Sequence, residues 1–251
     1  MTRLRWLTVG AAFVTLTAHG ARPLVTDDTR TVGRRGYQLE LGVSHSRDRD
    51  GGGLERRADN GVQVAYGARD NLDLSLELPW THRRIENGPV VSDARGFGDI
   101  ALSLKWRFWE SGAISVALKP KLSLPTGNEA EGLGAGRSGY GSDAIASVAA
   151  EPWNFRFQLG FFRNRNAIDE RRDIRSASFA VVRDLTERAK LAFDLGVATN
   201  TDKTEDDKPA FFIVGFLFAL TSGVTADAGY KKGITGPEVD RELVFGLTIA
   251  F

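Results

Sequence analysis

The fold can be inferred from Glu242-Leu243-Val244-Phe245-Gly246-Leu247-Thr248-Ile249-Ala250-Phe251, the last ten residues of the chain. Every second residue from Leu243 to Phe251 is large and apolar, whereas the residues between them are mostly small or polar. Because side chains of a β-strand alternate between its two faces, this segment predicts a strand with one apolar face. About ten residues of this pattern are typical of a strand that crosses an outer membrane, with lipid on one side and water on the other.

The same alternation recurs along the chain, for example at residues 72–81, 100–108, 114–124 and 190–197. A soluble barrel would fill its interior with large apolar residues and point its charges outward. Here the bulky face is almost free of charge, and the charged residues share the other face with Gly, Ala and Ser. The sequence therefore predicts an all-β protein, a transmembrane antiparallel up-and-down β-barrel of about twelve strands. We expect these strands at residues 36–47, 61–68, 72–83, 99–109, 113–124, 142–151, 155–164, 174–183, 189–199, 210–221, 223–233 and 241–251.

The connections between the expected strands alternate between short and long. The short turns are at residues 69–71, 110–112, 152–154, 184–188 and 222. The long, polar loops are at residues 48–60, 84–98, 125–141, 165–173, 200–209 and 234–240. Bacterial outer-membrane barrels have short periplasmic turns, longer extracellular loops and an even number of strands. The pattern therefore predicts a bacterial outer-membrane protein in which both termini of the chain lie on the periplasmic side.

Residues 1–20 have the features of a cleaved signal peptide. Arg3 and Arg5 precede an apolar stretch at residues 6–16, and small residues occupy the expected cleavage region at Ala18 and Gly20. An apolar run of this length is too short to span a membrane. We expect a signal peptide at residues 1–20, a periplasmic N-terminal segment at 21–35 and the outer-membrane β-barrel at 36–251.

The overall composition excludes several classes of function. The formal net charge is +1, with 33 basic and 32 acidic residues. This near-neutral balance argues against a nucleic-acid partner. The chain has no cysteine, which excludes disulfides, thiolate metal sites and cysteine nucleophiles.

Three segments resemble a family of bacterial outer-membrane transport proteins named after the meta-cleavage pathway of phenol degradation. The first is Pro23-Leu24-Val25-Thr26-Asp27-Asp28-Thr29, followed by Tyr37-Gln38-Leu39-Glu40. The second is Gly96-Phe97-Gly98-Asp99-Ile100, leading into Lys105-Trp106-Arg107-Phe108. The third is Lys121-Leu122-Ser123-Leu124-Pro125-Thr126-Gly127, with a glycine-rich stretch to Gly141. The resemblance covers roughly the first half of the chain and implies a link to aromatic catabolism.

Motifs that could carry chemistry are weak. Residues 134–139 match G-x-G-x-x-G, but no helical pattern follows to hold a pyrophosphate. Asp48, Asp50 and Glu55 have calcium-ligand chemistry, but arginines interleave with them. His45 lies between two serines that face the opposite side of its strand, so a nucleophile–base pair is not evident. We expect no enzyme, no cofactor and no metal site.

The inward-facing charges are the candidates for a solute pathway. Strand parity places fourteen of them in the lumen: Glu40, Asp73, Glu77, Asp99, Lys105, Arg107, Lys119, Lys121, Arg156, Lys190, Asp194, Asp227, Lys231 and Glu242. If they line water, they could orient a polar solute. If they pair with each other, they brace a narrow barrel. We expect Lys105, Arg107, Lys119 and Lys121 to form one basic patch.

The pattern as a whole favours an outer-membrane channel or transporter for a small solute, such as an aromatic or other organic compound. The alternative is a non-transporting structural or adhesive barrel that acts through its outer loops, and a distant third is an outer-membrane hydrolase. The expected partners are outer-membrane lipid, lipopolysaccharide and the small-molecule solute. A further expected partner is the barrel assembly machinery, through the aromatic residue Phe251, which resembles the terminal signal of such barrels.

Overall fold

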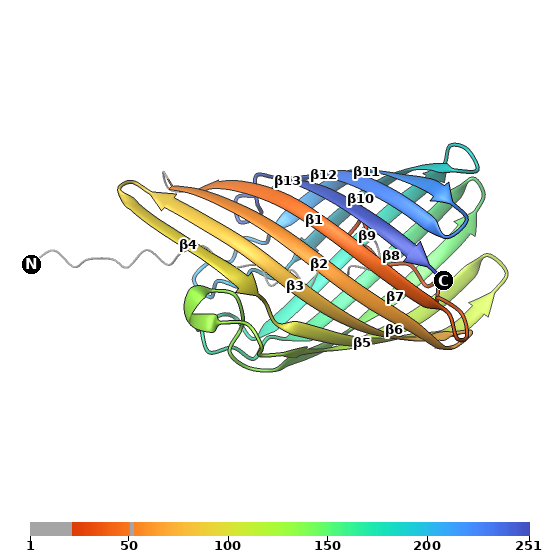
Figure 1. Ribbon diagram of the computed structural model, residues 1–251, viewed down its shortest axis with the longest axis horizontal. Coiled ribbons are helices and arrows are strands. Elements are labelled where there is room, and N and C mark those ends of the chain that lie inside the picture. Colours follow the sequence, from red (N-terminus) through yellow and green to blue (C-terminus); the bar gives the residue numbers. More distant parts are fainter. Residues whose placement is uncertain (1–21, 51–52) are drawn as a thin grey trace, which may run out of the picture.

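The computed structural model describes residues 22–50 and 53–251, which form an almost entirely β structure (Figure 1). The expected signal peptide lies outside these residues. The strands are β1 (Tyr37–Asp50), β2 (Gly53–Arg69), β3 (Leu72–Asn87), β4 (Val90–Phe97), β5 (Ile100–Ser111), β6 (Ile114–Leu124), β7 (Gly139–Ala150), β8 (Trp153–Arg163), β9 (Asp173–Asp184), β10 (Ala189–Ala198), β11 (Ala210–Thr221), β12 (Val224–Gly233) and β13 (Arg241–Ala250). A short 3-10 helix, η2 (Glu129–Glu131), interrupts the loop between β6 and β7. No helix in the described part of the chain is long and apolar enough to cross a membrane.

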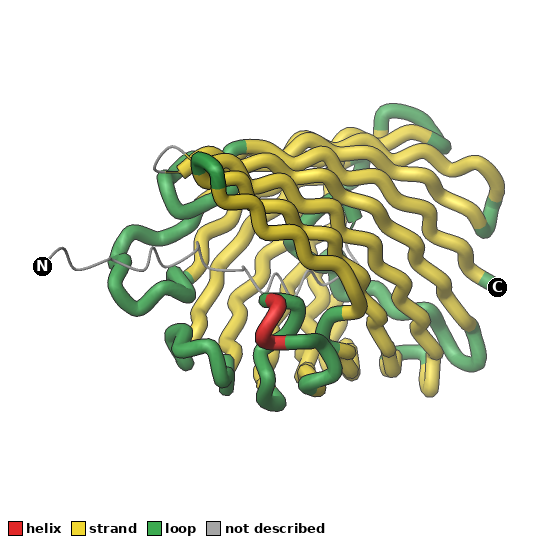
Figure 2. The backbone as a smooth tube through the Cα atoms, turned by 60° about the vertical axis from the view of Figure 1, so that its left-hand side comes forward, coloured by secondary structure: helices red, strands yellow, loops and turns green. Residues whose placement is uncertain are grey.

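The strands close into a barrel. Consecutive strands pair antiparallel around the sheet, β1 pairs with β13, and β2 pairs with β3 to complete the ring. β3 is longer than β4 and β5, and both of these strands pair with its edge opposite β2. Its first part pairs with β5, and its last part pairs with β4, which has no second neighbour (Figures 1 and 2). The wall therefore has twelve strand positions, which confirms the predicted fold. The single strand expected at residues 99–109 is correct for β5, but β4 was missed.

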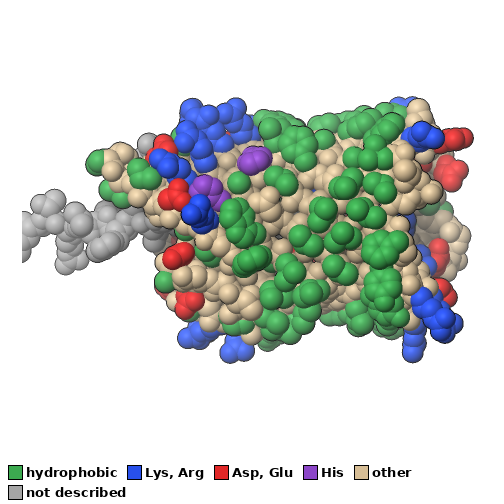
Figure 3. All heavy atoms as spheres, viewed as in Figure 1, with side chains coloured by type: hydrophobic (Ala, Val, Ile, Leu, Met, Phe, Trp, Pro, Cys, Tyr) green, Lys and Arg blue, Asp and Glu red, His purple; other side chains and the backbone are tan. Residues whose placement is uncertain are grey.

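The barrel is inside-out relative to a soluble protein, as β10 illustrates. The outward side chains of Phe193 and Leu195 are 47% and 52% exposed, whereas the inward Ala192 and Asp194 are 0% and 1% exposed. Figure 3 shows the outward apolar side chains as a broad band, with charged side chains gathered at its two ends. Such a band is typical of a barrel embedded in a membrane, with lipid around it.

Two of the expected long loops are wrong. Residues 48–60 belong largely to β1 and β2, and residues 84–98 to β3 and β4. These strand segments extend beyond the apolar band, so their outward faces need no apolar residues, and their inward faces carry polar side chains such as Arg57 and Arg83. The backbone pairing continues nevertheless, from Arg47 opposite Arg56 to Asp50 opposite Gly53. Alternating hydrophobicity arises only where one face of a strand contacts lipid, so it cannot predict strand segments that extend beyond the membrane.

Adjacent residues on β5 provide a test of the wall's two faces. Leu102 is 40% exposed on the outside, and Ser103 lies on the inner face opposite Lys121. Leu102→Arg would place a guanidinium in hydrocarbon, at a cost of roughly 2–4 kcal/mol near the bilayer midplane. We expect this variant to lose most of its heat-modifiable folded form in gel electrophoresis, whereas Ser103→Arg folds. Equal loss in the two variants would contradict the assignment of the faces.

Candidate functional site: an internal plug

The segment before β1 lies inside the barrel. We call residues 22–35 the plug. Leu24, Asp27 and Thr29 are 5%, 0% and 2% exposed, and their partners are inward-facing residues of the wall. The expected position of residues 21–35 in the periplasm is therefore wrong for the described residues. The reason is electrostatic, because the plug carries the counter-charges of lysines and an arginine that the wall directs inward.

The plug forms no strand, so its backbone N–H groups need other acceptors. Wall side chains supply them. Asp194 accepts from the backbone N–H groups of Val25 and Thr26 at 2.7 and 2.8 Å, and from the Thr26 hydroxyl at 2.6 Å. The backbone N–H groups of Asp27, Thr29 and Val32 donate to the side chains of Gln158, Ser147 and Asp73, respectively. The lumen is therefore built to bind an extended peptide.

Asp27 lies at the centre of the plug's contacts. Its two carboxylate oxygens each accept from one lysine, Lys105 on β5 and Lys119 on β6, both at 2.8 Å. Burial alone would raise the pKa of Asp27, but the attraction of the two ammonium groups outweighs it and lowers the pKa to about 2. Asp27 is therefore a carboxylate across the physiological pH range. The three groups form a closed, buried ion cluster.

Asp28 binds cations on the other side of the plug. Its carboxylate contacts Arg156 on β8 at 3.2 Å and Arg30 of the plug itself at 2.6 Å. Burial opposes the charged form, but these guanidinium groups together hold the pKa of Asp28 below its usual value. Asp27 and Asp28 thus attach one short segment to three strands of the wall.

Apolar contacts complete the plug's attachment. Leu24 packs in a buried cluster of wall residues that belong to β9, β10 and β11: Ala180, Val182, Ala192, Phe211 and Ile213. These inward positions are apolar, in contrast to the polar lumen that surrounds Asp27. The barrel interior therefore has an apolar region on one side, and Leu24 covers it.

Two wall glycines leave room for the plug. A Cβ atom at Gly42 would lie 0.6 Å from the guanidinium Nη1 of Arg22, and one at Gly67 would lie 1.7 Å from the backbone oxygen of Gly33. A larger residue at Gly67 would therefore displace the backbone of the plug, whereas one at Gly42 would displace the Arg22 side chain. At its base, Gly33 adopts a φ of +91°, a backbone conformation that glycine adopts readily. The plug is thus fitted to the wall at both its upper end and its base.

The structure brings together only part of the expected basic patch. Lys105 and Lys119 share Asp27, whereas Lys121 binds Asp143 on β7 at 2.9 Å. Arg107 lies near the turn at residues 70–71, where it binds the Asp70 carbonyl oxygen. The patch is divided because its members have separate acidic or carbonyl partners.

The other candidate residues fall into groups. Glu40, Glu77 and Asp227 lie within electrostatic reach of Arg22. Lys231 on β12 contacts Glu238 at 2.9 Å and Glu242 at 3.7 Å. Lys190 binds Asp184 at 2.8 Å, where both side chains are largely exposed. Asp73, Lys105, Lys119, Arg156 and Asp194 contact the plug directly.

Asp99 has a different role from the other inward charges. It lies between β4 and β5 and accepts from the backbone N–H groups of Gly127 and Ala135, at 2.9 and 2.8 Å. It therefore fixes the loop at residues 125–138 against the wall, at the point where β4 leaves the barrel. Leu133 of this loop is 8% exposed and lines the lumen above the plug.

Two cavities adjoin the plug. The first, of about 150 Å³, has an apolar side formed by Leu24, Val25, Leu133 and Ile213 and a charged side that includes Arg22, Arg57, Asp59, Glu77, Asp99 and Glu242. The second, of about 130 Å³, lies between Val25 and the small or aromatic residues of β8 to β11: Gly160, Phe162, Ser178, Gly196 and Phe211. Lys231 borders both. An apolar cavity of about 150 Å³ can hold a molecule of the size of benzene.

The histidines do not form a catalytic pair in the described structure. His82 binds Asp93 of β4 at 3.1 Å, on the outer face. His45, on the outer face of β1, lies opposite Leu243 and Ala58, whereas Ser44 faces inward and lines the first cavity. Residues 22–50 and 53–251 contain no group of three His, Asp or Glu side chains that could hold a metal ion.

The closed barrel and its apolar outer band define a bacterial outer-membrane β-barrel, with the plug in its interior. Residues 20–251 match the family described as "Putative MetA-pathway of phenol degradation". The chain belongs to this family, which confirms the resemblance seen in the sequence. No curated protein matches the chain.

Solved structures share the fold. An outer membrane channel from Pseudomonas putida F1 is 17% identical, with a TM-score of 0.73 over 89% of this chain and 98% of that one. The translocator domain of the autotransporter NalP from Neisseria meningitidis is 12% identical, with a TM-score of 0.55 over 87% and 89% of the two chains. The KdgM porin is 7% identical, with a TM-score of 0.57 over 84% and 99%. At these identities, the likeness extends to the fold alone.

Proposed function

We propose that the protein conducts a small organic solute across the outer membrane and that the plug is its gate. The observation that carries this proposal is the attachment of Asp27 and Asp28 to Lys105, Lys119 and Arg156, inside a barrel of the channel type. A barrel that served only as a scaffold could neutralise these cations with acids of its own wall. Here the counter-charges lie on a segment outside the wall, which is covalently continuous with β1 at its base and is otherwise held by non-covalent contacts.

The cavities support a solute of the size of a single aromatic ring. Their volumes of about 150 and 130 Å³ suit benzene-sized molecules. Leu24, Ile213, Phe162 and Phe211 offer apolar contact, and Arg22, whose Nε and Nη2 are buried without a hydrogen-bond partner among the described residues, offers a cation to a carboxylate or phenolate. We therefore propose aromatic acids and phenols as the solute class, in agreement with the family's description.

The base of the plug suggests the direction in which it leaves. Thr31 donates to the Asp70 carbonyl oxygen at 2.7 Å, and Arg35 donates its backbone N–H to Gly67 at 2.7 Å, both beside the short turn after β2. This end of the barrel carries the short turns and is therefore the periplasmic end. A segment connected there can swing into the periplasm, which opens the lumen from below.

A disulfide cross-link between the plug and the wall tests the gate. The hydroxyl oxygens of Thr29 and Ser115 are 2.5 Å apart, and the chain has no cysteine of its own. We expect Thr29→Cys/Ser115→Cys, reconstituted in liposomes, to admit a labelled hydroxybenzoate at least tenfold more slowly when oxidised than when reduced. The physical reason is that the cross-link keeps the plug in the lumen.

Each single cysteine variant is the control, and its uptake should not respond to the oxidant. One result would contradict the proposed transport of aromatic acids and phenols. If the wild type, the reduced pair and a variant with a weakened plug all match protein-free liposomes, the barrel is not a transporter for this class.

The runner-up function is a structural or adhesive barrel. One observation favours it, because Lys121 and Lys231 are paired with Asp143 and Glu238 and so brace the lumen. The expected absence of enzymatic activity stays a prediction.

A further inference from the structure

Five basic residues occupy matching positions on five neighbouring strands. Lys232 on β12 lies opposite Arg241 on β13, and Arg241 lies opposite Arg47 on β1. Arg47 lies opposite Arg56 on β2, which in turn lies opposite Arg84 on β3. We call these five residues the basic row. Neighbouring strands are about 4.8 Å apart, so the row spans about 19 Å across the wall.

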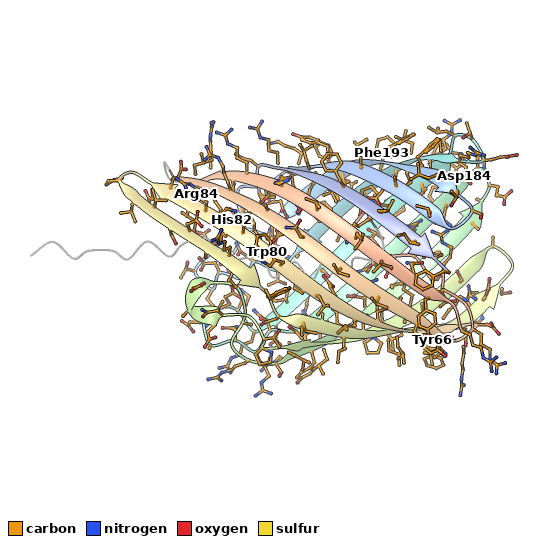
Figure 4. All side chains as sticks on the ribbon, in the orientation of Figure 1. Tyr66, Trp80, His82, Arg84, Asp184 and Phe193 are labelled. Carbon is orange, nitrogen blue, oxygen red and sulfur yellow. The ribbon has the colours of Figure 1, made fainter. Side chains whose placement is uncertain are left out.

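The basic row faces away from the lumen. Side chains an even number of residues apart on a strand point to the same face. Arg47 therefore shares the outer face with Val43, Arg241 with Leu243, and Arg84 with Trp80. Figure 4 shows Trp80, His82 and Arg84 in succession along β3, towards its free end. The row is therefore separate from the plug and from the cavities beside it.

The height of the row matches the headgroup zone of the membrane. On β13, the exposed Leu243 lies two residues below Arg241, and on β12 the exposed Tyr230 lies two residues below Lys232. Two residues correspond to about 7 Å along a strand. The headgroup region extends about 5–8 Å beyond the hydrocarbon on each side. In Figure 3, where the long axis of the barrel is horizontal, a group of basic side chains lies at the upper left, near the two histidines and at the left edge of the apolar band.

The charges of the row are only partly compensated. Glu86 binds Arg56 at 3.0 Å and Arg84 at 2.9 Å. Among the residues that the structure describes, none forms an ion pair with Arg47, Arg241 or Lys232, and the Arg47 Nε is buried without a hydrogen-bond partner. Like charges directly opposite each other destabilise a sheet. An external anion would remove this cost.

We propose that the basic row binds the phosphate groups of lipopolysaccharide in the outer leaflet. Guanidinium groups bind phosphate through paired, charge-assisted hydrogen bonds. A lipid-anchored phosphate fits better than a soluble one, because the row lies on the lipid-facing side, directly above the apolar band. Its span of about 19 Å leaves room for the two phosphates of one lipid A headgroup.

Lipid A binding tests the assignment. The purified barrel in a neutral detergent is titrated with diphosphorylated lipid A and with its dephosphorylated form, and complexes are counted by native mass spectrometry. We expect Arg47→Gln/Arg241→Gln/Lys232→Gln to bind diphosphorylated lipid A at least tenfold more weakly than the wild type. Both proteins should bind the dephosphorylated form weakly.

The matched control removes three positive charges at the periplasmic end, in Arg69→Gln/Arg183→Gln/Arg188→Gln. These side chains are exposed, and we expect lipid A binding within twofold of the wild type. Heat-modifiable mobility verifies the folding of both variants. Equal affinities of the two variants would overturn the proposal. Displacement of lipid A by millimolar inorganic phosphate would also overturn it, in favour of a site for soluble anions.

Discussion

Asp27→Asn is expected to release the plug and raise the ion conductance of the barrel. The substitution leaves the ammonium groups of Lys105 and Lys119 buried without a carboxylate. Removing one partner of a buried ion pair typically costs about 3–5 kcal/mol. The barrel can avoid this cost by expelling the plug and hydrating the lysines. Since 1.4 kcal/mol is a factor of ten, the open fraction should rise by about 100- to 4,000-fold, measured as open probability in planar bilayers.

Asp143→Asn is the matched control. It breaks a buried lysine–aspartate pair of the same type, with Lys121, but both residues belong to the wall. We expect some loss of stability in this variant and no rise in conductance. If both variants conduct equally, the plug is not what closes the lumen.

The pH dependence of the wild type has a defined sign. The pKa of Asp27 is lowered to about 2 in the folded protein, from an ordinary value near 3.8. Its contribution to plug binding is therefore fully present above about pH 4 and is lost as the pH falls through 2. We expect the wild type to stay closed from pH 8 down to pH 4. Opening between pH 6 and pH 5 would contradict the role of this cluster.

Asp194→Ala is expected to free the upper part of the plug. The side chain accepts three hydrogen bonds, from the backbone N–H groups of Val25 and Thr26 and from the Thr26 hydroxyl. Hydrogen bonds to a charged group contribute about 1.5–3 kcal/mol each. We expect the amides of Val25 and Thr26 to exchange with deuterium at least 100-fold faster than in the wild type, measured by mass spectrometry of peptides that cover residues 24–29.

Asp99→Ala is the control for Asp194→Ala, because Asp99 accepts hydrogen bonds from two backbone N–H groups of the loop at residues 125–138 instead of from the plug. Exchange should accelerate at Gly127 and Ala135 in this variant and stay unchanged at Val25 and Thr26. Asp194→Ala should give the converse pattern. Unchanged exchange in residues 24–29 of Asp194→Ala would mean that this carboxylate does not hold the plug.

The membrane-spanning part of the fold could be predicted because lipid imposes a strict rule on one face of each strand. On β10, Leu191, Phe193 and Leu195 alternate with inward residues, and the structure has the same alternation. Strand segments that extend beyond the apolar band are not subject to this rule. Arg47 to Arg57 are polar on both faces, so neither the upper part of β1 nor that of β2 carries a signal, although both remain paired.

The plug could not be predicted from periodicity, because residues 22–35 form no regular element. Its contacts join residues far apart in sequence, such as Val25 and Asp194, which are 169 positions apart. One signal was available. Buried charges need counter-charges, and the inward basic residues of β5 and β6, Lys105, Arg107, Lys119 and Lys121, have two acids directly opposite them in the wall, Asp73 and Asp143. Asp27 and Asp28 were adjacent acids with no assigned role in the sequence.

The plug's attachments have a consequence for the assembly of the protein. They come from strands distributed around most of the circumference: Asp73 on β3, Lys105 on β5, Lys119 on β6, Ser147 on β7, Gln158 on β8 and Asp194 on β10. No single hairpin carries more than a fraction of this set. The segment that leads into the first strand can therefore gain its full binding energy only after all the strands from β3 to β10 are in register. An incomplete barrel would remain open to water, and closure of the lumen would mark the end of folding.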